Sequence, residues 1–485
     1  MNHIASLFGA ALTLASAIFA QVPPAMTPFT HAGDLLVTDT GIGRVLRLAD
    51  LNLDGDLNDA GEVTVYVQGV VGTVTLGFPT AIAVDRRNVV FVADATADAI
   101  LRLEDLDGNG DCMGLGEARV WYTPSLSATP VPAPSIYGMV VSLDGAVYVA
   151  NFNSSAAGAG FDDILKFVDL NNDGDALDAG ECTIYATFTN ASIGASVPTN
   201  LGILPDGSIL YTETGSQSAV GAIPRGVWRL HDDVIPNGHC NDPGEITLWY
   251  SPPSAAATIM YGLAVDRDGT TFVTDTSFER VLKARDIDSN NLISLGTEES
   301  TFFTVGAPSS MWTCAIGDGL IAVVEDTTPD RIYFMRDVNN DGDAQDVGEK
   351  VDVYTDTAAA FDIGSPRAIA FLKGTSAQFT SVPLLIGQTA NLVIESSPAN
   401  LVSVYVGAIP AAISVAPYGV LSFDPLPGTY VELFSGIPMG PSGEVQIGIP
   451  IPYDPALLSL TLIMQGIGAG PSELRLAPSQ TLTFQ

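Results

Sequence analysis

The sequence predicts an all-β protein in which six copies of one four-strand unit form an array, followed by a small antiparallel β-sandwich. Three observations predict this fold class. A thirteen-residue acidic frame recurs six times, at a period of roughly fifty to sixty residues that is typical of stacked or radial repeats. Alternating segments rich in β-branched residues flank each frame, as strands do. After the sixth copy, one further strand-like segment remains at 365–371.

Each acidic frame begins with Asp and ends with Glu twelve residues later, with oxygen-bearing side chains at alternate positions. We call the frames acidic loops 1 to 6; they span 50–62, 105–117, 169–181, 233–245, 286–298 and 337–349. This spacing lets a tightly turning backbone aim successive oxygens at one hard cation, with Gly55 or its equivalents at the sharp turn. Because the recurring donors are oxygens, Ca²⁺ is the predicted ion, bound at several structural sites.

The predicted calcium ligands are the acids and asparagines of the repeating pattern: Asp50, Asn52, Asp54, Asp56, Glu62, Asp105, Asp107, Asn109, Asp111, Glu117, Asp169, Asn171, Asp173, Asp175, Glu181, Asp233, Asn237, Glu245, Asp286, Asp288, Asn290, Glu298, Asp337, Asn339, Asp341, Asp343 and Glu349. Loops 1, 3 and 6 are the richest in acids. Loop 4 has Ile235 and His239 where oxygens are expected, and loop 5 has Asn291 in place of glycine. We expect loops 4 and 5 to bind weakly or not at all.

Two alternatives to a calcium loop between strands are weaker. An EF-hand has five residues between its Gly and its Glu, whereas these loops have six, and their flanks indicate strands instead of helices. An acid-rich turn that binds no ion is disfavoured, because six sets of clustered carboxylates would repel one another without a cation.

The chain has 485 residues and a net charge of −36, which argues against nucleic acid and anionic membrane surfaces as partners. Within the loops lie 25 of the 55 acidic residues, so much of this charge belongs to the predicted ligands. Cys112, Cys182, Cys240 and Cys314 permit three disulfide pairings, and the sequence does not choose among them.

Residues 1–20 have the short apolar run and small-residue end of a secretory signal peptide. An anchor helix is the rival interpretation, but the run is shorter than the roughly 20 apolar residues that a membrane span needs. We therefore expect a secreted, extracellular or cell-surface protein, with the periplasm as an alternative and no membrane span after signal cleavage.

Strand motifs recur ahead of the acidic loops. Pro79-Thr-Ala-Ile-Ala-Val-Asp85 is followed by Val90-Phe-Val-Ala-Asp94, and Tyr261-Gly-Leu-Ala-Val-Asp266 is followed by Phe272-Val-Thr-Asp275. Each unit then has four strands, A to D, with the acidic loop between C and D. These motifs resemble the NHL-repeat and SMP-30/gluconolactonase-like group of β-propellers over roughly residues 30–372. The resemblance implies a six-bladed β-propeller, in which the segment 365–371 supplies the A strand missing from the first blade and closes the ring as one plus three strands.

The expected domains are a signal peptide at 1–20, a six-bladed calcium-binding β-propeller at 21–374 and a C-terminal β-sandwich at 375–485. After about residue 374 the acidic loops stop, charges thin out, and Pro and Gly separate short apolar strands. This pattern is typical of an antiparallel sandwich, and it looks like the C-terminal modules of some secreted bacterial proteins.

The central funnel is expected on the face made by the D–A and B–C connections, with Tyr137, Tyr261, Trp312 and Arg367 near its A strands. In gluconolactonase-like enzymes, a set of Asn and carboxylate side chains there holds a divalent metal that polarises a lactone carbonyl or activates water. The matching residues in this chain are Asn151, Asn200, Glu213 and Asp275. The family's Asn-Gly pair is displaced here, because Leu201 separates Asn200 from Gly202.

Strand-end acids can alternatively cap their own turns by hydrogen bonds to the backbone. We therefore predict a calcium-stabilised binding or structural module for an extracellular glycan, protein or polymer. A metal-dependent lactone hydrolase is the alternative.

Overall fold

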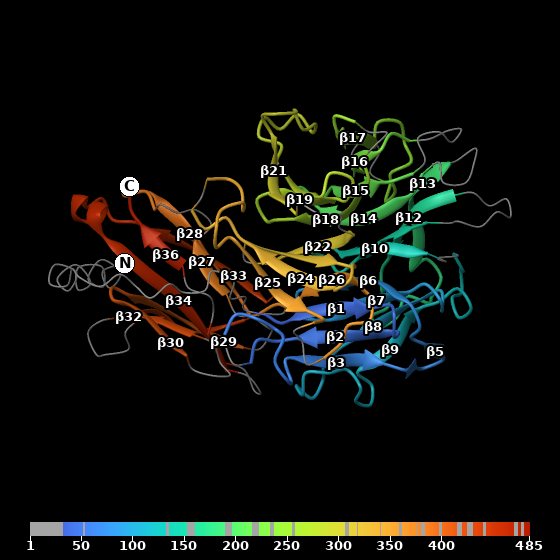
Figure 1. Cartoon of the computed structure of the whole chain (residues 1–485), viewed down its shortest axis with the longest axis horizontal. Coiled ribbons are helices and arrows are strands. Elements are labelled where there is room, and N and C mark those ends of the chain that lie inside the picture. Colours follow the sequence, from blue (N-terminus) through green and yellow to red (C-terminus); the bar gives the residue numbers. More distant parts are fainter. Residues whose placement is uncertain are drawn as a thin grey trace.

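A ring of four-stranded antiparallel sheets forms most of the molecule, and a second body of packed sheets lies beside it (Figure 1). The computed structural model describes residues 33–51, 54–131, 135–152, 161–189, 196–215, 223–232, 237–254, 258–305, 310–317, 319–339, 341–357, 361–374, 376–379, 384–396, 400–414, 420–423, 430–439, 443–469, 474–476 and 480–485. The predicted all-β fold, a six-bladed β-propeller followed by a small β-sandwich, is confirmed for this part of the chain. The predicted signal peptide lies outside the described residues. Among those residues, no helix has both the length and the apolar character to cross a membrane.

Each blade contains four strands, A to D in their order across the sheet. The strands are β26 (Pro366–Phe371), β1 (Leu35–Asp39), β2 (Arg44–Leu48) and β3 (Val63–Gln68) in blade 1; β6 (Pro79–Val84), β7 (Val90–Asp94), β8 (Ala99–Leu103) and β9 (Ala118–Tyr122) in blade 2; β10 (Ile136–Val141), β11 (Val147–Asn151), β12 (Phe161–Phe167) and β13 (Cys182–Thr189) in blade 3; β14 (Pro198–Ile203), β15 (Ile209–Glu213), β16 (Gly226–Leu230) and β17 (Ile246–Tyr250) in blade 4; β18 (Met260–Val265), β19 (Thr271–Asp275), β20 (Arg280–Ala284) and β21 (Glu299–Thr304) in blade 5; and β22 (Met311–Gly317), β23 (Leu320–Glu325), β24 (Arg331–Met335) and β25 (Lys350–Thr355) in blade 6. A short hairpin of β4 (Val70–Val71) and β5 (Val74–Thr75) lies between blades 1 and 2 in the chain.

The A strands form the inner wall of the ring, because each of them contacts the A strands of both neighbouring blades. Glycines permit this close approach. A Cβ added to Gly138 in β10 would lie 2.5 Å from the Cα of Asn200, and one added to Gly262 in β18 would lie 2.7 Å from the Cα of Thr313. Buried apolar side chains from adjacent blades then fill the space between the sheets.

The ring closes by pairing the last propeller strand with the first. Strand β26 runs antiparallel to β1, with Phe371 opposite Leu35 and Ile369 opposite Val37. The pairing extends past the strand ends, because the N–H of Leu372 donates to the carbonyl of Asp34 at 2.8 Å. The predicted closure, one strand from the end of the propeller plus three from its start, is confirmed, and it gives β1 an antiparallel partner on its inner side.

Every acidic loop is bonded to the blade that precedes it in the ring. The backbone N–H of the eighth loop residue donates to a carbonyl of the preceding D strand: Leu57 to Val353 (2.7 Å), Cys112 to Tyr66 (2.7 Å), Ala176 to Trp121 (2.8 Å), Cys240 to Tyr185 (2.6 Å), Ile293 to Trp249 (2.7 Å) and Ala344 to Phe302 (2.8 Å). All six donor residues are buried. The loops are therefore joints between blades as well as connections within them.

β-Bulges in the D strands make these joints possible. In each blade the register between strands C and D shifts at the residue whose carbonyl accepts the bond, for example at Trp121 in β9 and at Trp249 in β17. A bulge leaves one residue outside the ladder of its own sheet. Its carbonyl is then available to the next blade. Basic side chains add to the joints, since Arg47 donates to the carbonyl of Gly110 at 3.2 Å and Lys283 donates to that of Gly342 at 3.0 Å.

The C-terminal body is an antiparallel sandwich. One sheet has the order β27-β28-β33, the other has the order β32-β29-β34-β35 with β36 also paired to β34, and β30 pairs with β31. Side chains of both larger sheets, such as Leu392 and Val404, share one buried core. The elements are β27 (Ser376–Phe379), β28 (Thr389–Glu395), β29 (Leu401–Gly407), β30 (Pro410–Ser414), β31 (Val420–Phe423), β32 (Tyr430–Pro438), β33 (Glu444–Pro450), the 3₁₀ helix η1 (Pro455–Ser459), β34 (Thr461–Ala469), β35 (Leu474–Leu476) and β36 (Gln480–Thr483).

The blade-to-blade joints predict a position-specific effect of proline. Ala176→Pro removes the N–H that bonds to Trp121 and should lower the free energy of unfolding by about 2–3 kcal/mol, because it leaves a buried carbonyl without its donor. Ala179→Pro is the matched control. Ala179 is the second residue of a turn in which Glu181 N–H bonds to Asp178 at 3.2 Å and Gly180 has a φ of 89°.

This turn geometry accepts proline at its second position, and loop 4 carries Pro243 there. Ala179→Pro should therefore leave stability unchanged or raise it slightly. Urea denaturation of both variants measures the difference. Equal stability of the two variants would show that the Ala176 bond does not stabilise the ring.

Candidate functional site

The acidic loops share one internal frame, built on a buried glutamate. In loop 1, Glu62 accepts the N–H of Leu51 at 3.1 Å with one carboxylate oxygen and that of Asp59 at 3.0 Å with the other. The glutamates of the other loops accept corresponding bonds. All six glutamates are buried: Glu62, Glu117, Glu181, Glu245, Glu298 and Glu349. In loops 1, 2, 3, 5 and 6 the glutamate also accepts an N–H at the start of the loop, so it holds the two ends of the loop together.

The first aspartate of each loop holds the sharp turn. Asp50 accepts the N–H of Asp54 at 3.2 Å and that of Gly55 at 3.0 Å. Asp169, Asp286 and Asp337 make equivalent pairs of bonds, and Asp105 accepts the N–H groups of Gly108 and Gly110. The sixth loop residue has a positive φ, 94° at Gly55 and 64° at Asn291. Asn291 therefore takes the turn conformation that glycine provides elsewhere, which asparagine tolerates.

The remaining predicted ligands that the structure describes form consecutive Asx turns. In each, a side-chain oxygen accepts the N–H of the residue two positions later, as Asp54 does from Asp56 at 3.1 Å. The residues in this arrangement are Asp54, Asp56, Asp107, Asn109, Asp111, Asn171, Asp173, Asp175, Asn237, Asp288, Asn290, Asn339, Asp341 and Asp343. Each aspartate keeps a second oxygen, so the loop backbone is shaped before any ion binds.

Carboxylates converge in four of the loops. Their oxygens lie within 4.8 Å of one another in Asp50, Asp54 and Glu62, in Asp105, Asp107 and Glu117, in Asp286, Asp288 and Glu298, and in Asp341, Asp343 and Glu349. These groups could hold a metal ion. Loop 5, expected to be weak, brings three carboxylates together. Loop 3, expected to be among the best, does not form such a group from Asp169, Asp173 and Glu181.

Two predicted ligands, Asn52 and Asp233, lie outside the described residues. In loop 4, the position that Asp50 takes in loop 1 is taken by Asp232, one residue earlier than the sequence pattern indicates. Asp232 accepts the N–H of Asn237 at 3.0 Å and that of Gly238 at 2.7 Å. The signal that could have revealed this is the pair of adjacent aspartates at 232–233, because either can begin the loop. Loop 4 is thus one residue longer than the others.

The candidate funnel residues are largely engaged in backbone capping. Glu213 is fully buried at the end of β15, where it accepts bonds from Ser196 Oγ at 2.6 Å, Val197 N–H at 2.7 Å and Gly215 N–H at 2.6 Å. Asp275 ends β19, accepts the N–H of Ser277 at 3.2 Å and pairs with Arg280 at 3.3 Å. Among the described residues, neither carboxylate belongs to a group of three metal-ligating acidic, His or Cys side chains.

Of the two asparagines in the candidate set, Asn151 lies opposite Asp163 of β12, and Asn200 lies in β14. Asn151 is buried at the end of β11. Asn200 donates from Nδ2 to Thr313 Oγ1 at 3.2 Å, and its Oδ1 accepts the N–H of Leu201 at 2.8 Å. The equivalent strand-end acid of blade 2, Asp94, accepts four backbone N–H groups between 2.6 and 2.9 Å. Capping of the adjacent turns is therefore the main role of the strand-end acids Glu213, Asp275 and Asp94.

Bulges at the start of the A strands shape the funnel. The register between strands A and B shifts at Tyr137 in β10, at Tyr261 in β18 and at Trp312 in β22, and a bulge re-aims the side chain that it carries. The Trp312 ring lies 4.6 Å from the Tyr261 ring, and the Arg367 guanidinium lies 3.3 Å from the centre of the Trp312 ring. Burial lowers the pKa of Arg367 from its ordinary value of 12.5.

The funnel cluster, Tyr261, Trp312 and Arg367, keeps polar groups without partners. The buried Nε1 of Trp312 has no hydrogen-bond partner within the described part of the chain. The Arg367 guanidinium stacks on the Trp312 ring and forms no ion pair with the residues that the structure describes, a geometry that favours cation–π attraction. Because three A strands present the cluster at one end of the ring, it offers flat apolar faces beside one positive charge.

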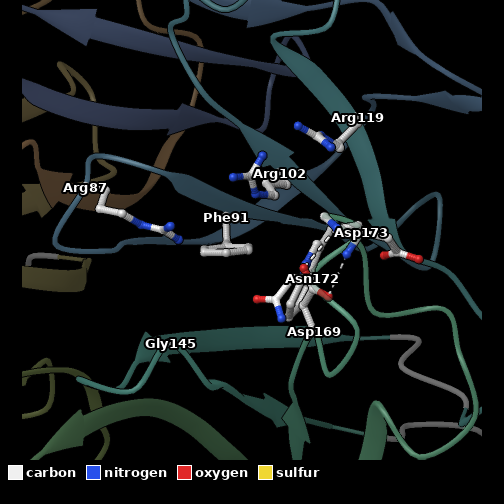
Figure 2. A pocket seen from close by; sticks show the side chains of 10 residues that line it. Arg87, Phe91, Arg102, Arg119, Gly145, Asp169, Asn172 and Asp173 are labelled. Carbon is white, nitrogen blue, oxygen red and sulfur yellow. Dashed lines mark hydrogen bonds between the residues drawn. The ribbon is translucent and has the colours of Figure 1, made fainter. Parts of the chain in front are cut away.

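A pocket lies between blades 2 and 3, at the end of the blades that carries the acidic loops and beside loop 3. This pocket of about 330 Å³ is lined by Arg87, Phe91, Arg102, Arg119, Trp121, Gly145, Asp169, Asn172, Asp173 and Gly174 (Figure 2). Arg87 pairs with Asp85 at 3.1 Å and Arg102 pairs with Glu104 at 2.8 Å. Two of its three arginines are thus neutralised by acids of their own blade.

The four cysteines Cys112, Cys182, Cys240 and Cys314 are buried free thiols.

The buried Glu213 predicts a pH-dependent stability. Burial raises the pKa of this carboxyl from its ordinary value of 4.5 to about 7, against the opposing effect of its hydrogen bonds. Because the folded state holds the proton more tightly than the unfolded state, the stabilisation is full below pH 4.5 and is lost as the pH rises through 7. Glu213→Gln keeps the side-chain shape without the charge.

Between pH 5 and pH 8, the free energy of unfolding of Glu213→Gln should therefore improve relative to the unaltered protein by about 2–3 kcal/mol. Urea titrations at both pH values, with the calcium concentration fixed, measure this change. A difference that does not vary with pH would contradict the assignment.

Comparisons with known proteins show similarity at the level of the fold. No family model matches the chain, and no curated protein sequence matches it. Solved structures that resemble it include virginiamycin B lyases and gluconolactonase-like proteins. A streptogramin B lyase structure is 14% identical, with a TM-score of 0.42 over 74% of this chain and 91% of the other. The calcium-binding protein regucalcin from Agrobacterium tumefaciens is 11% identical, with a TM-score of 0.39 over 68% of this chain and 84% of the other.

Proposed function

We propose that this protein is a secreted, calcium-stabilised β-propeller that binds an extracellular glycan, protein or polymer at its central funnel. The observation that carries the proposal is the contrast between the two sets of polar groups. Acidic side chains converge in the loops between strands C and D, whereas the acids at the funnel cap the backbone. Cation binding belongs to the first set, and ligand recognition belongs to the aromatic and cationic cluster at the funnel.

The acidic loops suit Ca²⁺ in donor type and in rigidity. Their ligands are carboxylate oxygens held by Asx turns, and Ca²⁺ accepts six to eight oxygens in adaptable geometry. Such an ion would offset two of the three negative charges of the converging carboxylates, which repel one another in its absence. Since each loop is also bonded to the preceding blade, an ion bound to the loop stabilises the joint between two blades.

The funnel cluster suits recognition better than hydrolysis. A lactonase of the gluconolactonase type needs carboxylates that hold a catalytic metal, and Glu213 and Asp275 instead bind turn backbone. Tyr261 and Trp312 provide ring faces, and Arg367 provides a charge with five donors. A ligand with an apolar ring face and an acidic or hydroxyl-rich edge matches these groups.

An extracellular location fits both parts of the proposal. Loops of modest affinity fill with calcium at extracellular concentrations, which are in the range that weak sites require. The signal-like residues 1–20 would direct the chain there.

Removal of calcium should destabilise the protein. Each saturated site adds about 2.7 kcal/mol when the free ion is at 100 times its dissociation constant. Chelator-treated protein should therefore unfold at a markedly lower urea concentration, and added Ca²⁺ should restore the midpoint. Mg²⁺ at the same concentration is the control, because its strict octahedral preference fits these loops poorly. An unchanged midpoint after complete calcium removal would refute the structural role of the loops.

The funnel cluster should decide ligand binding. On an array of extracellular glycans and surface polymers, Trp312→Ala and Arg367→Ala should each weaken binding at least tenfold, since stacking and charge are both lost. Trp228→Ala is the matched control, because Trp228 lies in β16 and bonds to the carbonyl of Pro224 at 2.9 Å, away from the funnel cluster. A lactone-hydrolysis screen runs alongside. Turnover that disappears in Glu213→Gln and Asp275→Asn would favour the lactonase instead.

A further inference from the structure

Acidic loop 4 differs from the others at the residue that supplies the seventh position. Loops 1, 2, 3 and 6 carry an aspartate there: Asp56, Asp111, Asp175 and Asp343. Loop 4 carries His239. An imidazole nitrogen therefore replaces a carboxylate oxygen at a position that, in loop 6, contributes Asp343 to the converging carboxylates. This changes the kind of ion that the loop can hold, because Ca²⁺ prefers oxygen whereas Zn²⁺ and related ions accept imidazole.

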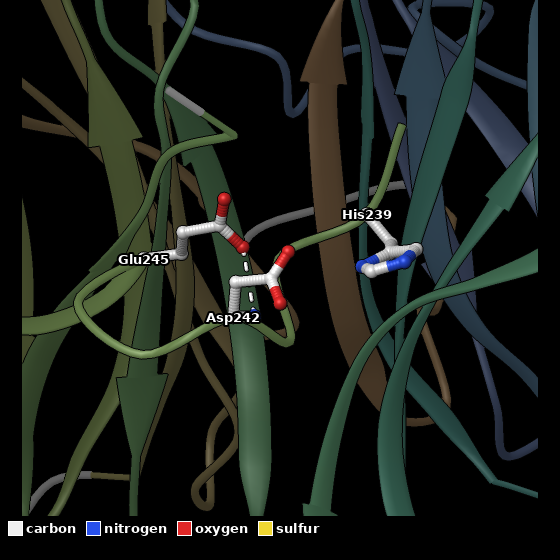
Figure 3. Close-up of side chains that lie close together, drawn as sticks. All are labelled: His239, Asp242 and Glu245. Carbon is white, nitrogen blue, oxygen red and sulfur yellow. Dashed lines mark hydrogen bonds between the residues drawn. The ribbon is translucent and has the colours of Figure 1, made fainter. Parts of the chain in front are cut away.

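The side chains of His239, Asp242 and Glu245 converge. One ligand atom of each lies within 4.8 Å of the other two. Figure 3 shows the imidazole on one side of the group, with a ring nitrogen on the edge that faces the two carboxylates. Among the described residues, this is the only such group that contains a nitrogen donor. Imidazole nitrogen and carboxylate oxygen are both ligands that zinc sites use.

A second observation points to a bound cation. The Nδ1 atom of His239 is buried, and it makes no hydrogen bond within the described part of the chain. A buried polar atom without a partner is costly, and a protonated nitrogen at this place would be expected to bond to the adjacent carboxylates. A metal ion among the three side chains would satisfy the nitrogen and neutralise both acids.

The loop backbone fixes the three side chains. The N–H of His239 donates to Asn237 Oδ1 at 3.2 Å, and Asn237 Nδ2 donates to Asp242 Oδ2 at 2.7 Å. The N–H of Asp242 donates to Glu245 Oε2 at 2.9 Å. The next residue, Cys240, is fully buried and bonds through its N–H to Tyr185. Cys240 thus anchors the loop to blade 3 on one side of the chain, while His239 faces the acids.

We propose that acidic loop 4 is a transition-metal site, selective for Zn²⁺ over Ca²⁺, in which His239, Asp242 and Glu245 are the protein ligands. The loop keeps the Asx-turn frame of its calcium-type relatives, and one nitrogen changes its metal preference. Three protein ligands leave a further coordination position for water. The site is independent of the funnel and of the ligand that the funnel binds.

Zinc titration tests the proposal. The full-length protein is stripped with a chelator, saturated with Ca²⁺ and then titrated with Zn²⁺ by calorimetry. One equivalent of Zn²⁺ should bind in the presence of excess Ca²⁺. His239→Ala should weaken this binding by more than about 100-fold, beyond the 10- to 100-fold that loss of an outer partner costs. His231→Ala is the matched control and should retain the zinc affinity.

A gain-of-function variant keeps the test independent of folding defects. His239→Asp restores the aspartate of loops 1, 2, 3 and 6, so it should lose Zn²⁺ binding and gain one equivalent of Ca²⁺. Zinc-induced shifts of the His239 ring ¹⁵N resonances should accompany binding in the unaltered protein. The proposal is overturned if no Zn²⁺ binds under excess Ca²⁺, or if the affinity is the same in His239→Ala and His239→Asp as in the unaltered protein.

Discussion

The backbone bond between neighbouring blades is the constraint on which the acidic loops depend. A bulge in each D strand removes one carbonyl from its own sheet, and a buried carbonyl must find another donor. The eighth residue of the next loop supplies it, six times around the ring. That hydrogen bond fixes the position of the eighth residue of each loop. The first seven residues therefore form a tight turn next to it, which brings their side chains toward the buried glutamate at the end of the loop.

The periodic features of this fold could be predicted from the sequence, and the irregular ones could not. Six acidic frames and the extra strand at 365–371 indicate six blades and their closure. The spacing of these segments can be measured along the sequence without any knowledge of side-chain contacts. Bulges at residues such as Trp121 leave no comparable signal. The extra residue in loop 4 was hidden by a second aspartate beside Asp232, and the capping role of Glu213 depends on turns whose shape only the structure gives.

The two ends of the blades differ in how strictly their residues repeat from blade to blade. At the loop end, the same residue types recur at the same positions, as expected of parts that must fit identical joints. At the funnel end, the second residue of the A strand is Thr80, Tyr137, Thr199, Tyr261, Trp312 or Arg367. Equivalent positions therefore carry different chemistry around the funnel. Repetition serves the scaffold, and the departure from repetition lies where we propose that the ligand binds.

The closure of blade 1 also sets an order of events for a chain made from its N-terminus. Strand β1 acquires its inner neighbour only after β26 has been synthesised, more than three hundred residues later. Until then β1 exposes a row of unpaired peptide groups, and contacts so distant in sequence form slowly. A nascent propeller of this kind is vulnerable to strand exchange between molecules. The inner edge of β1 therefore stays without its native partner while more than three hundred further residues are made.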